Sequence, residues 1–200
     1  MMTPTHLFLN WALLEQKTGT SRERLALICG AIFPDIGVWI FGLWFIFTQS
    51  DLAHEHWDAL YMAPQNYHLF SLLHSFLLWP ALLVLGFILK QRTMLFFSVS
   101  GLFHSVCDFF LHVDDAYAHL YPLSDFVFRS PVSYWNPAYY GNIFSPIDSA
   151  IGFLASLYLS SQVHSKWGKY ALFIIAMAFG FSFFSRLFLR QSLYSIFIVG

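Results

Sequence analysis

The chain has 200 residues, of which 58% are hydrophobic, 20% aromatic and only 10% charged, whereas a soluble domain carries about 25% charged residues. Together with a mean hydropathy of +0.59, this composition predicts an integral membrane protein. A formal net charge of −1 gives no indication of nucleic-acid binding, and two cysteines within apolar runs exclude a zinc ribbon or a disulfide framework.

The pattern of apolar runs predicts an all-α, polytopic membrane protein with a short amino-terminal helix and about five transmembrane helices. The short helix, at 4–16, is apolar but cannot cross a bilayer comfortably at ~1.5 Å of rise per residue. Pro34-Asp35 lies in the middle of the first span and must kink it or break it into two half-helices. No repeat or second domain is visible, which indicates one integral membrane domain over 1–200. The five spans are expected at 25–47, 67–89, 93–113, 146–163 and 170–189.

Basic residues predict the orientation of these spans. They gather in alternate connections, whereas the two polar loops at 48–66 and 114–144 hold one basic residue between them, Arg129. By the positive-inside rule, the basic connections should be cytoplasmic and the polar loops extracytoplasmic. We therefore expect a multi-pass protein of the inner (plasma) membrane. The basic residues are Lys17, Arg22, Arg24, Lys90, Arg92, Lys166 and Lys169.

Ionisable residues inside the apolar segments are the strongest indication of function, because inserting each one costs about 2.5–3.5 kcal/mol. Four of them belong to three different spans and lie ~8–18 Å from the extracytoplasmic ends, at ~1.5 Å per residue. One shared site explains this common depth better than three unrelated polar residues. The five ionisable residues are His6, Asp35, His74, His104 and Asp108.

The spacing within the third span supports a shared site. His104, Asp108 and His112 lie at positions i, i+4 and i+8, so they follow one face of a helix. Imidazole nitrogen and carboxylate oxygen suit zinc or a comparable first-row metal. The sequence therefore predicts a divalent-metal site, with zinc as the first choice, to which His74 and Asp35 contribute from neighbouring spans.

Structural interpretations of the same residues stay open. His74 could hydrogen-bond a neighbouring carbonyl group, and Asp35 could cap a broken helix. Asp148 follows Ser145-Pro146 in a capping pattern, with an acid three residues after the N-cap, so it could serve only its own helix.

The connection at 114–144 is long, polar and aromatic. A connection of about thirty residues without clear structure is usually functional or disordered, and this one is too aromatic to be disordered. It is either an ordered loop at the membrane surface or a lid that completes a site. As a lid, it offers Asp114 or Asp115 to orient ligand imidazoles or to take the proton of a water molecule. Arg129 would pair with an anionic headgroup, unless it only anchors the loop at the interface.

Four short motifs follow one another along the chain: His6, Pro34-Asp35, His74-Ser75 and the HxxxD of His104 and Asp108. In this order they resemble the YdjM-type family of bacterial inner-membrane metal-dependent hydrolases. The resemblance covers about residues 3–150, and the stretch 112–135, with PLSD and SPVSYW, looks like a sub-branch of that family. Such relatives often carry histidine where this chain has Val113 and Tyr117, which leaves these two positions outside the ligand set.

The YdjM-type family is in turn distantly similar to the all-helical zinc-dependent phospholipase C and single-strand nuclease group, whose multinuclear zinc site cleaves phosphodiesters. This similarity implies that the residues of the four motifs bind metal, with Asp108 as a bridging carboxylate. It offers His112, His119 and Asp148 as candidates for a second metal. The soluble group also uses its amino-terminal amine as a ligand, of which Met1-Met2 gives no sign.

The residues and the resemblance together predict a membrane-bound, metal-dependent hydrolase similar to phospholipase C, acting on phosphoesters of lipid-type substrates. Its metal-site part would cover 3–150, and its carboxy-terminal spans 146–190. The expected partners are the lipid bilayer and a small-molecule or lipid-linked substrate, without nucleic acid and with an oligomeric state that the sequence does not predict. The alternative is a non-catalytic membrane interaction or metal-binding protein.

Overall fold

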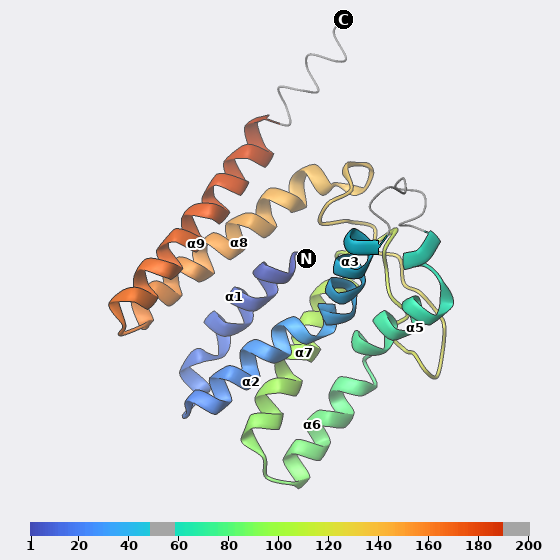
Figure 1. Cartoon of the computed structure of the whole chain (residues 1–200), viewed down its shortest axis with the longest axis horizontal. Coiled ribbons are helices and arrows are strands. Elements are labelled where there is room, and N and C mark those ends of the chain that lie inside the picture. The colour runs from blue at the N-terminus through green and yellow to red at the C-terminus, as the bar shows by residue number, and fades with distance from the viewer. Residues whose placement is uncertain (49–58, 190–200) are drawn as a thin grey trace, which may run out of the picture.

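The computed structural model describes residues 1–48 and 59–189, and all the regular secondary structure in that part of the chain is helical, without a strand. The all-α prediction is therefore confirmed over the described residues, whereas ten residues of the expected polar loop at 48–66 lie outside them. Figure 1 labels eight longer helices, which are α1 (Thr3–Leu14), α2 (Ser21–Ile32), α3 (Ile36–Thr48), α5 (Pro64–Leu73), α6 (Leu78–Ile88), α7 (Arg92–Phe109), α8 (Gly141–Gln162) and α9 (Lys166–Phe184). Shorter helical turns are η1 (Glu15–Lys17), η2 (Phe33–Asp35), η3 (Pro137–Tyr139) and η4 (Ser185–Leu189).

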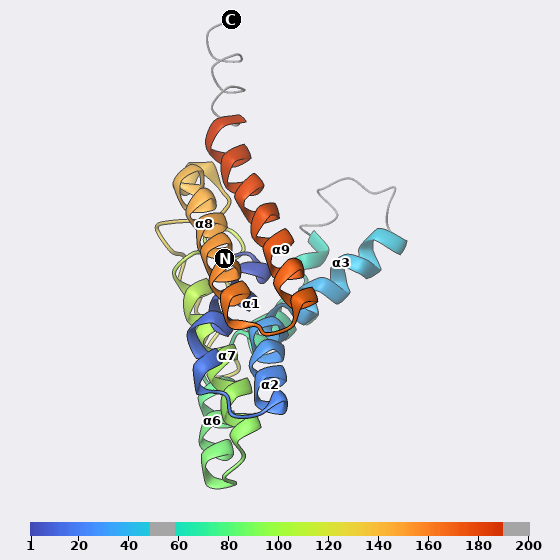
Figure 2. The ribbon, with the colours of Figure 1, turned by 90° about the vertical axis from the view of Figure 1, so that its left-hand side faces the viewer.

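Helices α1 and α7 join the sequence-adjacent pairs through two sequence-distant contacts, α1 with α8 and α7 with α2. Helix α7 packs on α2 and α6, while α1 lies between α2 and the hairpin of α8 and α9. In the rotated view of Figure 2, α3 extends away from the other helices. This arrangement brings the start of α1 next to the carboxyl end of α7.

Three helical stretches are long and apolar enough to cross a membrane: Ser21–Thr48, Gly141–Gln162 and Lys166–Phe188. The pair α5 and α6, bent by 41°, would make a fourth. Helix α7 occupies the position of the expected third span but is not among the candidates. The count of five spans accordingly stays a prediction.

A 3-10 turn interrupts the first candidate span where Pro34 lies. Proline has no backbone N–H and its ring clashes with the preceding turn, so the regular α-helix cannot continue through it. The turn η2 joins α2 to α3 and carries Asp35, which is 9% exposed. The interruption therefore presents a carboxylate to the helices packed against it.

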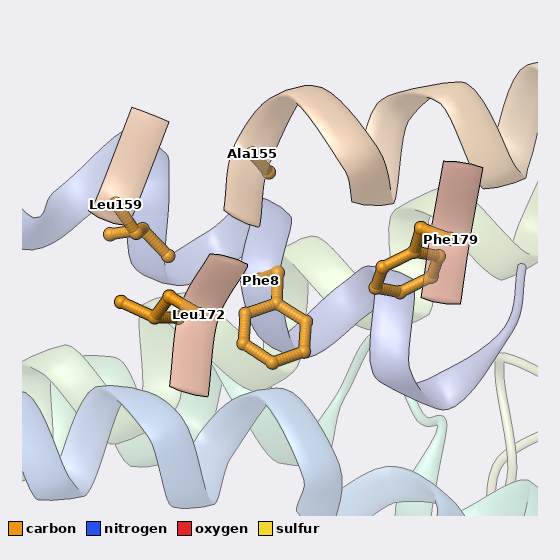
Figure 3. Packing of buried hydrophobic residues seen from close by; sticks show 5 residues of the cluster. All are labelled: Phe8, Ala155, Leu159, Leu172 and Phe179. Carbon is orange, nitrogen blue, oxygen red and sulfur yellow. The ribbon is translucent and has the colours of Figure 1, made fainter. Parts of the chain in front are cut away.

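A small apolar core holds α1 against the hairpin of α8 and α9. Phe8 meets Phe179 edge to face, with ring centroids 5.9 Å apart, beside Ala155, Leu159 and Leu172 (Figure 3). Close packing of this kind stabilises helix pairs in membranes, where lipid removes most of the hydrophobic driving force. The core fixes the position of α1, whose first turn reaches the candidate site.

Several helix ends differ from the expected ones, and the expected second span at 67–89 consists of two helices, α5 and α6. Helix α8 begins at Gly141, several residues earlier than the Ser145-Pro146 pattern predicts, because Tyr140 adopts a left-handed conformation (φ 61°) and Gly141 N–H donates to the Asn136 carbonyl. Pro146 consequently lies inside the helix. Helix α7 ends at Phe109, before the expected end of its span at residue 113.

Candidate metal centre

Four of the predicted ligands converge in one buried cluster. Their ligand atoms all lie within 4.8 Å of one another, in a group that could hold a metal ion. The residues come from three parts of the fold: Asp35 from η2, His74 from the end of α5, and His104 and Asp108 from α7. The convergence expected from their common depth is thus present.

Backbone carbonyl groups orient both imidazole rings. His104 donates from Nδ1 to the Ala31 carbonyl of α2 at 2.8 Å, and His74 donates from Nδ1 to the Phe70 carbonyl of its own helix, also at 2.8 Å. The Nε2 atoms of both rings are buried without a hydrogen-bond partner. A histidine that binds metal through one nitrogen and donates its other N–H to a carbonyl has this arrangement.

The distances around these Nε2 atoms favour a cation between the four side chains. Nε2 of His104 lies 3.1 Å from Asp108 Oδ2 and 3.5 Å from Asp35 Oδ1, and Nε2 of His74 lies 3.4 Å from each of the same oxygens. In a neutral ring whose proton is on Nδ1, Nε2 is an acceptor and faces carboxylates, which also accept. A shared cation would turn this repulsion into attraction.

Asp108 contacts a second group of polar atoms through its other oxygen. Asp108 Oδ1 lies 2.8 Å from His6 Nε2 and 3.3 Å from His112 Nε2. The His6 ring stacks on the His104 ring at 3.7 Å. The backbone N–H of His112 donates to the Asp108 carbonyl at 3.1 Å, which keeps His112 near Asp108 although α7 has ended. The Asp108 carboxylate thus lies between two sets of histidines.

The amino group of Met1 is a feature of the centre that the sequence did not indicate. It donates to Asp108 Oδ1 at 2.8 Å and lies 3.3 Å from His112 Nε2. Met1 is 7% exposed. The similarity to the soluble group raised an amino-terminal amine, but Met1-Met2 gave no sign of it, so only the position of α1 in the fold reveals this contact.

The carboxylates after α7 lie at the rim of the centre. Asp115 Oδ2 lies 3.1 Å from His112 Nδ1 and accepts from Trp135 Nε1 at 3.1 Å. Burial would raise the pKa of Asp115, but the neighbouring His112 holds it below its usual value. Asp114 is exposed and accepts from Asn136 Nδ2. Asp115 is therefore placed to orient the His112 ring.

Three other candidates lie outside the cluster. His119 donates from Nδ1 to the Tyr117 carbonyl at 3.0 Å, and burial followed by the nearby His74 lowers its pKa to about 4. Arg129 is exposed in the loop. Asp148 is buried but bonded to the first turn of α1 rather than to the histidines.

A cavity of about 730 Å³ lies beside the centre. Asp35, His112 and Met1 line it on the side of the centre. Apolar side chains of α3, including Val38 and Leu43, form another part of the lining. The remaining lining includes the carboxylates of Asp114 and Asp115 and the rings of Tyr61, Tyr117, Tyr134 and Trp135. The cavity thus joins the polar centre to an apolar surface.

Comparisons with protein-family models, with curated proteins and with solved structures found no match to this chain.

Proposed function

We propose that the chain is a membrane-bound, metal-dependent hydrolase that acts on phosphoesters of lipid-type substrates. The observation that carries the proposal is the pair of buried imidazoles, His74 and His104, whose unpartnered Nε2 atoms face two carboxylates. Burying acceptors against acceptors is costly unless a cation joins them. The resemblance to metal-dependent hydrolases agrees with such a centre.

The donor set fits one or two divalent ions, with zinc as the first choice because all donors are nitrogen or oxygen atoms. One ion would be held by Asp35, His74, His104 and Asp108 Oδ2, and a second by His6, His112 and Asp108 Oδ1. When bound, such an ion acts as a Lewis acid on a phosphoryl oxygen and lowers the pKa of a coordinated water to about 7.

Residues at the rim would complete the catalytic site. Asp115, 3.1 Å from His112 Nδ1, holds that ring in orientation. Asp114 is the exposed carboxylate in the cavity lining and is the better placed of the two to accept a proton from water. Arg129 stays a candidate for binding an anionic headgroup from the exposed loop.

The cavity supports a substrate that is partly apolar. Its α3 wall belongs to a stretch apolar enough to cross a membrane, and its opposite end touches the polar centre. A lipid-type phosphoester has the same two parts. The expected five-span topology would place this cavity at the extracytoplasmic surface, with the basic connections on the other side.

A non-catalytic metal-binding or membrane interaction protein remains the second candidate. The same buried cluster supports it, because a metal held only for structure needs the same donors. A third arrangement, in which protonated imidazoles pair with the two carboxylates, needs no metal at all. Metal content and turnover separate these three.

The decisive experiment measures zinc in the purified protein and hydrolysis of a phosphodiester, either bis-(p-nitrophenyl) phosphate or phospholipid in vesicles. The wild type should contain about one or two zinc ions per chain and turn over, because the donors can close around them. The double variant His104→Ala/Asp108→Asn should lose both zinc and activity. Metal that survives this double variant would remove the site from consideration.

The matched control is His68→Ala/Asp125→Asn. His68 and Asp125 form an exposed pair with a distance of 3.7 Å outside the cluster, so this variant loses the same residue types without touching the centre. It should keep both zinc and activity. Tight zinc without turnover on any ester in the wild type would favour the non-catalytic candidate.

A further inference from the structure

The first turn of α1 is bonded to carboxylates on three other elements. Two of these, Asp108 of α7 and Asp35 of η2, belong to the metal centre, whereas Asp148 of α8 does not. Asp148 therefore needs a separate explanation. The bonds are those of the Met1 amine and His6 to Asp108, of Thr3 Oγ1 to Asp35 Oδ2 at 2.5 Å, and of Met2 N–H and Thr5 Oγ1 to Asp148.

Both oxygens of Asp148 are used by this turn. Asp148 is 2% exposed; its Oδ1 accepts from Met2 N–H at 3.2 Å and its Oδ2 accepts from Thr5 Oγ1 at 3.0 Å. A buried carboxylate is costly unless it is hydrogen-bonded, so these two bonds are the reason that it is tolerated. Asp148 neither caps α8 nor reaches the histidines.

The two residues that bind Asp148 each adjoin a residue that binds Asp108. Thr5 precedes His6, and Met2 follows Met1. The bonds at Thr5 and Met2 hold the start of α1 on α8, while the core around Phe8 holds the same helix further along. In this orientation His6, which is fully buried, lies 2.8 Å from Asp108 Oδ1.

Arg186 strengthens the same contact from η4. It donates to the hydroxyl groups of Ser182, at 3.0 Å, and of Ser145 on α8, and its Nη2 lies 3.3 Å from Met2 Sδ. Its positive charge lies on the α8 surface that Asp148 shares with the first turn of α1. The surface of α8 that faces the start of α1 is thus polar, with Asp148 and with Ser145 bonded to Arg186.

We propose that Asp148 is a positioning residue that holds the first turn of α1 so that His6 is fixed against Asp108. The expected effect of Asp148 on metal binding rests on the proposed function, because displacing His6 lowers metal affinity only if the centre binds a metal ion. Asp148 touches neither the cavity nor the histidines, so it acts entirely through α1.

The test compares Asp148→Ala, which removes both acceptor oxygens, and the isosteric Thr5→Val with the wild type through two measurements. In metal-free protein, modification of each histidine by diethyl pyrocarbonate is followed by mass spectrometry. His6 should become several-fold more reactive in both variants. His74 and His104 should stay protected, because they are bonded to carbonyl groups of α5 and α2. Zinc affinity, measured by competition with a chelator, should fall about 10–100-fold, as is typical when a residue that orients a ligand is lost.

Ser149→Ala is the matched control, because Ser149 is equally buried on α8 but its hydroxyl bonds Ser182 of α9 instead of α1. It should leave both measurements unchanged. The double variant Asp148→Ala/Thr5→Val should be no worse than Asp148→Ala alone, since Asp148→Ala already removes the one contact that Thr5→Val removes.

The outcomes separate the two proposals. His6 that stays protected in both variants overturns the positioning role, whatever the zinc result. Equal exposure of all three histidines also overturns it, because that result indicates general loosening of the fold. A wild type that binds no zinc defeats the proposed function, while the labelling of His6 still decides the role of Asp148.

Discussion

Tyr117 takes part in the candidate centre without offering a ligand. Its ring stacks on the His74 ring with centroids 3.8 Å apart, and its hydroxyl group lies 3.1 Å from that of Tyr61. Tyr117 is 3% exposed. Tyr117 thus places an aromatic surface where it restricts the rotation of the His74 ring.

Variants of Tyr117 should separate the ring from the hydroxyl group. Tyr117→Phe keeps the stacked ring, so zinc affinity should change little. Tyr117→Leu removes the ring that orients His74 and should lower zinc affinity about 10-fold, by analogy with other residues that orient ligands. Competition with a chelator measures both. Equal losses in the two variants would instead assign the effect to the hydroxyl group.

Residues that are costly in a membrane could be identified from the sequence, whereas their partners could not. Asp35, His74, His104 and Asp108 stand out because an apolar segment rarely tolerates them. The bond from Asp148 to Thr5 depends on how α1 is rotated against α8, which no local pattern records. The capping pattern at Ser145-Pro146 pointed to a different role because it describes only the local helix.

At the scale of the elements, the contact between α2 and α7 determines the orientation of His104, one of the candidate metal ligands. Gly30 lies on α2 where a Cβ atom would be 2.2 Å from the Phe97 carbonyl oxygen of α7. Because this close approach is possible, the Ala31 carbonyl comes within 2.8 Å of His104 Nδ1. The orientation of His104 therefore depends on a small residue one position away from its hydrogen-bond acceptor.

Gly30→Ala should push α2 and α7 apart, since the obstructing atom belongs to the backbone and cannot move alone. Overpacking of this kind destabilises a protein by about 1–3 kcal/mol, and we expect lower thermal stability in detergent together with weaker zinc binding. Gly180→Ala on α9 is the control, because its nearest neighbour would lie at an ordinary 3.4 Å. Equal melting temperatures for the two variants would contradict the close-approach argument.

The approximate positions of the helices followed from the apolar runs, but several of their ends and the break between α5 and α6 did not. Hydropathy averages over many residues, whereas a helix end depends on individual hydrogen bonds. Helix α8 begins at Gly141 because of the left-handed Tyr140 and the Asn136 carbonyl. In the sequence, neither the left-handed conformation of Tyr140 nor this hydrogen bond gives a stronger signal for a helix start than the Ser145-Pro146 pattern downstream.

At the scale of the whole molecule, the basic connections lie apart from the long loop that borders the candidate centre. In Figure 1 the turns that follow α1, α6 and α8 lie at the left and bottom, and the long loop before α8 lies at the upper right. The carboxyl end of α7 and the first turn of α1 point toward that loop. A membrane orientation set by the basic turns would therefore also set the side on which the cavity opens.

Cysteine accessibility tests this orientation in intact cells. With Cys29 and Cys107 replaced by alanine, we expect Leu123→Cys in the long loop to react with a membrane-impermeant maleimide from outside the plasma membrane. Trp167→Cys, in the first turn of α9, should react only after permeabilisation, because its neighbours Lys166 and Lys169 favour the cytoplasm. Both side chains are more than four-fifths exposed on the protein, at 82% and 84%, so packing against other residues does not protect either from the maleimide. The reverse labelling pattern would place the cavity on the cytoplasmic face, and a substrate would then have to approach from the inner leaflet.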